Sequence, residues 1–293
     1  MTFSSVFSIS LAGINAFSAG LESVSANIAN SQTAGYKRVR TDFSALVGAT
    51  AGDRDTSVGD AARGAGVTAE ARLLNGEQGA LTRTGEATNI AISGNGFFAV
   101  ADNANGASRT NAALFTRAGA FTADANGNLV NEAGYFLLGA PAAADGNAPT
   151  IGDVNSLQTV NLNVAPAQAA DPDALGALTS VEIDADGRVL GTYATGETFA
   201  LFQIPLALFI NPQGLEQADA TTFHANDASG EASLARARDG AAGAIEGAAL
   251  ELSTVDIGQE FSDLIVVQRA YSSSARALTV ADDLWRTLTE TAA

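Results

Sequence analysis

Both ends of the chain carry long stripes of apolar residues at helical spacing, and no other feature constrains the fold as strongly. From Phe3 to about Asn30, apolar side chains recur at steps of three and four residues, which places them on one face of a helix. The same steps return over about thirty residues at the other end of the chain. Two long helices are therefore expected to bracket everything else.

Each stripe is a run of bulky side chains that a lone helix would leave in water. Full burial of such side chains is worth about 1.5–3 kcal/mol each, so both helices need partners. We expect them to pair as a coiled coil within one chain, and such pairs to pack against sister chains. The candidate assembly interface is therefore formed by Leu11, Ile14, Phe17, Leu21, Val24, Ile28, Ile257, Phe261, Leu264, Val267, Tyr271, Leu278, Trp285 and Leu288.

The first helix also contains residues suited to close packing. Its small side chains would let another helix approach the backbone, and they belong to Ala12, Gly13, Ala16, Ala19 and Gly20. Near the end of this helix, Asn27 and Asn30 are expected to cap the helix or to hydrogen-bond across to its neighbour.

The middle of the chain shows a different pattern, with short alternating runs separated by turn residues. Residues 89–100, 113–138 and 181–209 alternate apolar and polar side chains, as strands do. Asp-Ala-Asn-Gly at 124–127, Asp-Ala-Asp-Gly at 184–187 and Ala-Thr-Gly at 194–196 predict tight turns. We therefore expect an α+β protein, with paired terminal helices and a β-rich middle domain of hairpins and meanders that is barrel-like or sandwich-like.

These patterns divide the chain into four segments. They are an N-terminal helix at 1–34, an extended linker at 35–70, a β-rich domain at 71–254 and a C-terminal helix at 255–293. Inside the β-rich domain, residues 140–180 are expected to be loop-rich with one short strand. The Gly/Ala/Asp-rich stretch at 47–66 has few residues that could build a core, and we expect it to act as a compliant joint.

Charge and cysteine content exclude several kinds of partner and chemistry. The net charge of −17 repels phosphate backbones, so nucleic acid is a poor partner. No cysteine is present, which excludes disulfides and thiolate chemistry. The N-terminal segment lacks a basic region and a continuous apolar run, so we expect neither a cleavable signal peptide nor membrane insertion.

No group of residues predicts catalysis. Gly94-Asn95-Gly96 is followed by a strand-like run instead of a helix, which favours a hairpin turn over a dinucleotide loop. The two Asp-rich turns lack the downstream glutamate of a calcium loop. The only histidine, His224, has no second nitrogen or sulfur ligand, and Asp282 with Asp283 fits a solvated helix flank. We therefore expect no enzyme activity, no cofactor and no metal.

Several blocks, in a fixed order, resemble the bacterial flagellar hook and basal-body rod family. The most specific is Leu21 to Lys37, LESVSANIANSQTAGYK, which resembles the family's N-terminal helix and its exit. ISGNGFF at 92–98, FTRAGAF at 115–121 and NLVN at 128–131 resemble its β region. GAALELSTVD at 247–256 and QRAY at 268–271 resemble its C-terminal block.

Within this family the chain is more similar to hook proteins than to rod proteins. The residues that carry this preference are GTYATGE at 191–197 and FINPQGL at 209–215. The segment 140–180 is too short for the second large β domain of bigger hook proteins, so a minimal hook subunit and a distal or proximal rod subunit both stay open. The adhesive alternative, a secreted β-rich module whose end helices only dimerise, predicts a small closed oligomer instead.

The resemblance implies a structural subunit that polymerises with itself into a curved helical tube, which transmits torque from rod to filament. The implied partners are further copies of the chain, the distal rod and hook-filament junction proteins, the hook cap and the flagellar type III export apparatus. The implied location is the hook or basal body of the flagellum, outside the cell after export.

Overall fold

The computed structural model describes residues 3–47, 64–104, 113–143, 149, 151–169 and 175–291. The chain forms two compact units. The helical unit contains residues 1–31, 38–74 and 255–293, and the β unit contains residues 32–37 and 75–254.

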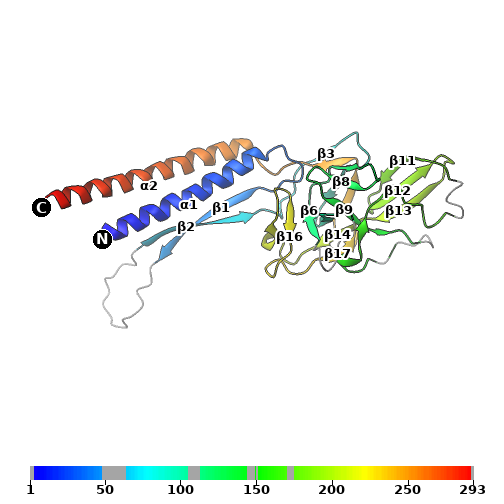
Figure 1. Cartoon of the computed structure of the whole chain (residues 1–293), viewed down its shortest axis with the longest axis horizontal. Coiled ribbons are helices and arrows are strands. Elements are labelled where there is room, and N and C mark those ends of the chain that lie inside the picture. Colours follow the sequence, from blue (N-terminus) through cyan, green and yellow to red (C-terminus); the bar gives the residue numbers. More distant parts are fainter. Residues whose placement is uncertain are drawn as a thin grey trace. The chain divides into compact units, whose positions relative to one another are not determined.

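The helical unit is built from the two ends of the chain and one hairpin. Its helices are α1 (Phe3–Ala29) and α2 (Ile257–Thr291), which lie side by side and run in opposite directions (Figure 1). Asp256 starts α2, because its Oδ1 accepts the backbone N–H groups of Gly258 at 2.8 Å and Gln259 at 3.2 Å. A carboxylate at this position satisfies N–H groups that the helix itself leaves unpaired.

The hairpin of the helical unit is made of β1 (Val39–Val47) and β2 (Gly64–Leu73), which pair antiparallel. The described parts of the expected linker, residues 35–47 and 64–70, thus include most of these two strands. Residues 48–63, which make up most of the expected compliant joint, lie outside the described residues. The four-segment division of the chain stays a prediction.

The described part of the β unit contains the remaining strands and the short 3-10 helices η1 (Val154–Ser156) and η3 (Pro212–Gly214). One large sheet has the order β11-β12-β13-β9-β5-β6-β16-β15, with β7, β8, β10, β14 and β17 pairing beside this path, and it is curled like a half-barrel. Two small sheets join β18 to β4 and β19 to β3. The strands are β3 (Leu81–Arg83), β4 (Ile90–Ser93), β5 (Phe97–Ala101), β6 (Leu114–Thr116), β7 (Phe121–Ala123), β8 (Leu129–Asn131), β9 (Phe136–Pro141), β10 (Gln158–Thr159), β11 (Leu178–Ile183), β12 (Arg188–Tyr193), β13 (Thr198–Gln203), β14 (Pro205–Leu208), β15 (Glu216–Gln217), β16 (Thr222–His224), β17 (Ser233–Arg236), β18 (Ala244–Gly247) and β19 (Ala249–Glu251).

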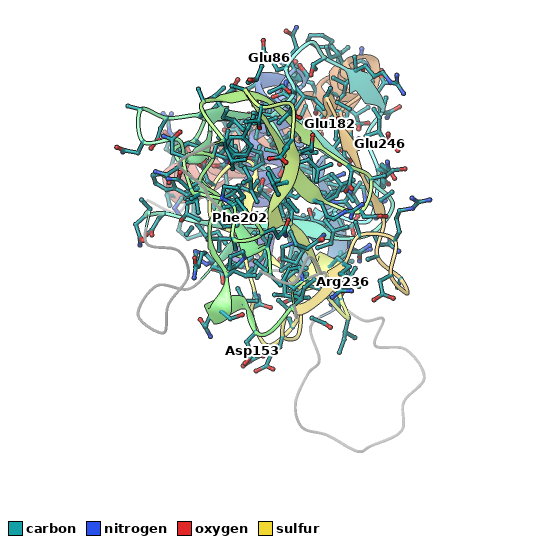
Figure 2. All side chains as sticks on the ribbon, turned by 90° about the vertical axis from the view of Figure 1, so that its right-hand side faces the viewer. Glu86, Asp153, Glu182, Phe202, Arg236 and Glu246 are labelled. Atoms are coloured by element: carbon teal, nitrogen blue, oxygen red, sulfur yellow. The ribbon has the colours of Figure 1, made fainter. Side chains whose placement is uncertain are left out.

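One hydrophobic core fills the β unit. It is lined by buried side chains from strands that are far apart in sequence, including Ile92, Phe98, Leu137, Phe202 and Ile245. Figure 2 shows Phe202 near the middle of the β unit, with Glu86 and Asp153 at opposite margins of the view. The buried strand residues are mostly apolar, with a few polar ones among them such as Thr116, Thr222 and Gln203.

Two hairpins of the β unit use the same turn. Asp124 Oδ1 accepts the N–H groups of Asn126 and Asn128, both at 2.8 Å. Asp184 Oδ1 accepts those of Asp186 at 3.0 Å and Arg188 at 2.8 Å. The side-chain hydrogen bond from Asn128 lowers the pKa of Asp124 below its usual value. The turns predicted at 124–127 and 184–187 are therefore confirmed, with the carboxylates bonded to their own backbone.

The α+β class with paired terminal helices and a β-rich middle is confirmed. The Gly94-Asn95-Gly96 segment is a turn with positive φ at both glycines, but it is not a hairpin. The flanking strands β4 and β5 belong to different sheets, because β4 pairs with β18. The hairpin interpretation of this segment is wrong, since β-strand runs on both sides of a turn do not by themselves show that the two strands pair.

Candidate assembly interface

The two terminal helices meet along a seam with a seven-residue repeat. A Cβ added to Gly13 would lie 2.9 Å from Ser274 Oγ, and one added to Gly20 would lie 3.2 Å from Val267 Cγ1. One further repeat along, Asn27 Nδ2 donates to Glu260 Oε2 at 3.0 Å. The facing positions advance by seven residues in α1 and fall by seven in α2, which is the spacing of an antiparallel coiled coil. Glycine at two of these levels brings the helix backbones close together.

The last level of the seam is polar and tied to the hairpin. Asn27 Oδ1 accepts the Val39 N–H at 2.9 Å, and its Nδ2 donates to the Val39 carbonyl at 2.8 Å. Glu260 pairs with Arg38 Nε, and Arg38 Nη2 donates to Asp263 at 3.0 Å. The cross-helix hydrogen bond expected of Asn27 is confirmed. One buried amide thus fixes where α1, α2 and β1 meet.

The hairpin packs on α1 through small residues of the helix. A Cβ on Gly20 would lie 2.9 Å from the Phe43 ring, and the Phe17 and Phe43 ring centroids are 5.4 Å apart. Ala12 Cβ lies 2.8 Å from the Cβ position of Gly66. The small residues of α1 that were expected to allow close helix packing therefore serve both α2 and the hairpin.

A groove of about 270 Å³ opens where α1, α2 and β1 meet. Its apolar wall includes Val24, Phe43, Val266 and Val267, and its polar wall includes Arg38, Glu260 and Asp263. Arg38 forms an ion pair with each of the two carboxylates of that polar wall.

The predicted interface residues are buried to very different extents within one chain. Val24 and Val267 are buried, and Ile14, Phe17, Leu21, Ile28, Leu264, Tyr271 and Leu278 are half-buried. Leu11, Ile257, Phe261 and Trp285 are exposed. Nothing is described for the side chain of Leu288. The predicted stripe therefore includes the seam and extends beyond it.

Two groups of residues fall outside the predicted stripe. Buried positions of the two helices also include Ser10, Ala16, Asn27, Glu260 and Ala281, which are small or polar. The exposed apolar residues of α2 also include Ile265, Val266, Val280 and Leu284. A search at seven-residue steps would have found Glu260 and Ala281, because positions 260, 267, 274 and 281 form one column.

We expect that an engineered disulfide can join α1 to α2 in the register described above. In a chain with no cysteine of its own, Gly13→Cys with Ser274→Cys places two Cβ atoms about 3.5 Å apart, which is within the range of a disulfide. Mild oxidation should give a monomer with shifted electrophoretic mobility and no free thiol.

The matched control is Gly13→Cys with Ser273→Cys, whose second position is exposed and lies one residue off the seam. In this control the two cysteines of one chain should form a disulfide far more slowly than in the variant with Ser274→Cys. Equal linking in the two variants, or links only between chains, would contradict the register.

The residues that were considered for metal binding or acid–base chemistry, His224, Asp282 and Asp283, are all exposed. No group of three or more His, Asp or Glu side chains in the described ranges could hold a metal ion. His224 is exposed at the end of β16, and Asp282 and Asp283 are exposed on α2. Among the described helices, none is both long and apolar enough to cross a bilayer.

Comparison with known families gives two matches. Residues 91–191 match the family described as flagellar hook protein FlgE/F/G D1 domain. Residues 246–291 match the family described as flagellar basal body rod FlgEFG protein C-terminal.

Individual relatives carry both hook and rod names. A flagellar basal-body rod protein FlgG of Agrobacterium fabrum is 31% identical over 287 residues, which covers 94% of this chain and 95% of the relative. A flagellar basal-body rod protein FlgG of Bacillus subtilis is 29% identical over 291 residues, and this alignment covers 95% of this chain and 95% of the relative. A flagellar hook protein FlgE of Brucella suis is 26% identical over 391 residues, which covers 94% of this chain and 95% of the relative.

Paired terminal helices, a β-rich middle and these matches in the expected order agree with one another. The family is structural and non-enzymatic. The chain therefore belongs to the flagellar hook and basal-body rod FlgE/F/G family and is a hook or rod subunit of the bacterial flagellum.

Proposed function

We propose that this subunit builds the flagellar hook, by packing its terminal helices against those of sister subunits in a curved helical tube that transmits torque from rod to filament. The observation that carries the proposal is the amount of apolar surface left on α2 within one chain. Val266 is 66% exposed and Trp285 is 51% exposed, and Phe261 and Leu284 are similar.

The exposed apolar residues of α2 are spread around the helix. At seven-residue steps, every column of α2 contains an apolar side chain except the one formed by Ser262, Arg269, Arg276, Asp283 and Glu290. A helix that is apolar on most sides is stable when it is surrounded by protein. Within the helical unit α1 covers one side of α2, and Arg38 pairs with Glu260 and Asp263 near its start. Neighbouring subunits are the natural cover for the rest.

The energy available for assembly is substantial. Burial of each exposed Phe, Leu, Ile or Val side chain contributes about 1.5–3 kcal/mol. Contacts that join different surfaces of identical subunits do not close on themselves, so they extend into a helical filament. The main partners are therefore further copies of the chain. The other proposed partners are the distal rod, the hook-filament junction proteins, the hook cap and the type III export apparatus.

A second candidate, a rod subunit, is favoured by the length of the chain. The alignments to the two FlgG relatives span 287 and 291 positions, close to the 293 residues of this chain. The alignment to the Brucella suis FlgE spans 391 positions, so the hook relative carries insertions that this chain lacks. The run at 191–215, which is similar to hook proteins, supports the hook instead.

Immunogold labelling of isolated hook–basal bodies separates the two candidates. We expect gold over the hook, outside the rings of the basal body, and loss of hooks in cells that lack the gene. Gold confined to the rod would overturn the hook assignment in favour of the rod. Gold on neither structure would contradict both.

A further inference from the structure

Three blocks that are far apart in sequence meet inside the β unit at the carboxylate of Glu251. The segment that follows α1 supplies Lys37, the segment between β6 and β7 supplies Arg117, and β19 supplies Glu251. The side chains of Lys37 and Glu251 are 0% exposed, and that of Arg117 is 5% exposed. The assembly surface on α2 does not involve these groups, so they need another explanation.

Glu251 accepts hydrogen bonds at both carboxylate oxygens. Its Oε1 accepts from Lys37 Nζ and from the Gly79 N–H at 2.8 Å. Its Oε2 accepts from Arg117 Nη1 at 3.3 Å. One carboxylate therefore serves two buried cations.

Elsewhere in the described part of the β unit the two cations contact carbonyls and a ring, and the charge of Glu77 also favours the charged form of Lys37, though less than that of Glu251. Lys37 Nζ also donates to the Glu77 carbonyl, and Arg117 Nη2 donates to the Gly94 carbonyl at 2.9 Å. The Arg117 guanidinium lies 5.2 Å from the centroid of the Phe97 ring. Burial lowers the pKa of both Lys37 and Arg117, and Glu251 opposes that shift. Glu251 is thus the main group that makes these two buried charges tolerable.

Backbone contacts hold the same segments in place. The Gly35 N–H donates to the Glu251 carbonyl at 2.8 Å, and the Thr254 N–H donates to the Tyr36 carbonyl at 3.2 Å. Gly35 has φ of 72°, and a Cβ there would lie 2.4 Å from the Ala118 nitrogen. The segment before β1 and the segment after β19 therefore lie side by side within the β unit.

Glu251 lies far downstream of both cations in the sequence. It follows Lys37 by 214 residues and Arg117 by 134 residues. Its strand β19 pairs with β3, and the preceding strand β18 pairs with β4, whose residues Ile90 and Ile92 belong to the core. Early strands of the β unit thus depend on the last two strands for both pairing and charge compensation.

We propose that Glu251 makes folding of the β unit conditional on its last strands, because Lys37 and Arg117 cannot be buried before β19 is in place. A buried cation without its partner costs far more than the intact pair contributes. A chain whose N-terminal part is available first would therefore stay open until residue 251 is present. For a subunit that leaves the cell as an open chain, a use that rests on the proposed function, this delays folding until the whole β unit has emerged.

The first test compares two substitutions in the full-length chain. Glu251→Gln should lower the ratio of folded to unfolded β unit by about 100-fold or more. Glu246→Gln, on the exposed side of the neighbouring strand β18, should change that ratio by no more than about twofold. Urea unfolding, followed by hydrogen exchange of the β5 and β9 amides, gives both ratios. Equal behaviour of the two variants would overturn the proposal.

The second test separates folding order from stability. The triple variant Lys37→Met, Arg117→Met, Glu251→Leu removes all three charges and should recover at least about tenfold of the loss seen in Glu251→Gln. In pulse-labelled hydrogen exchange during refolding, wild-type β5 amides should gain protection together with β19 amides. In the triple variant they should gain it earlier. Protection of β5 before β19 in the wild type, or an unchanged order in the triple variant, would overturn the proposal.

Discussion

Gly119→Ala is expected to destabilise the β unit by about 3 kcal/mol or more. A Cβ at this position would lie 1.6 Å from the Ile90 carbonyl oxygen, so two backbone segments would have to separate. The Ile90 N–H also donates to the Gly119 carbonyl at 2.9 Å, and Ile90 is fully buried in the core. Urea unfolding followed by hydrogen exchange of the core strands measures the loss.

The matched control for this substitution is Gly85→Ala. No atom lies within 4 Å of a Cβ built at Gly85, so its effect should stay within about 0.5 kcal/mol. A loss at Gly119 as small as that at Gly85 would mean that the approach of the two backbone segments is not as close as the structure has it.

Phe261→Gln is expected to raise the concentration needed for polymerisation by about 30-fold or more, without unfolding the monomer. The Phe261 ring is already half exposed in one chain, so its removal leaves few internal contacts unsatisfied. In a tube the same ring would be buried against a sister subunit. Every subunit added to the tube would therefore lose this apolar contact in the variant. Sedimentation of polymer against total protein concentration gives the change.

The neighbouring residue provides the control. Ser262 lies in the one column of α2 without apolar side chains, and its hydroxyl donates to the Gly258 carbonyl of its own turn. Ser262→Gln should leave the polymerisation concentration within about threefold of the wild type. Equal effects of the two substitutions would argue against burial of the Phe261 face on assembly.

The sequence predicts the terminal helices well, because a helical stripe can be recognised from local spacing alone. It also predicts the turns at Gly127 and Gly187, whose positive φ values of 86° and 82° suit glycine. It does not reveal which strands pair. β4 joins β18 across about 150 residues, and nothing in either strand identifies the other.

The interface illustrates the same limit. Bulky residues such as Phe261 mark the apolar stripe, yet the seam itself is formed by Gly13, Gly20 and Asn27 opposite Ser274, Val267 and Glu260. The sequence does predict close packing at Gly13 and Gly20 and a cross-helix bond from Asn27. Ser274 and Glu260 of α2 cannot be found by a search for apolar spacing, since close backbone approach and a hydrogen bond replace apolar burial there. Lys37, likewise, could not be recognised as buried without its partner Glu251.

The fluorescence of Trp285 reports whether sister subunits cover the apolar surface of α2. Trp285 is the only tryptophan of the chain and is 51% exposed on α2. As polymer forms, its emission should shift to shorter wavelength and its quenching by acrylamide should fall, because water leaves the indole. Polymer that grows while the emission and quenching of Trp285 stay those of the monomer would contradict the claim.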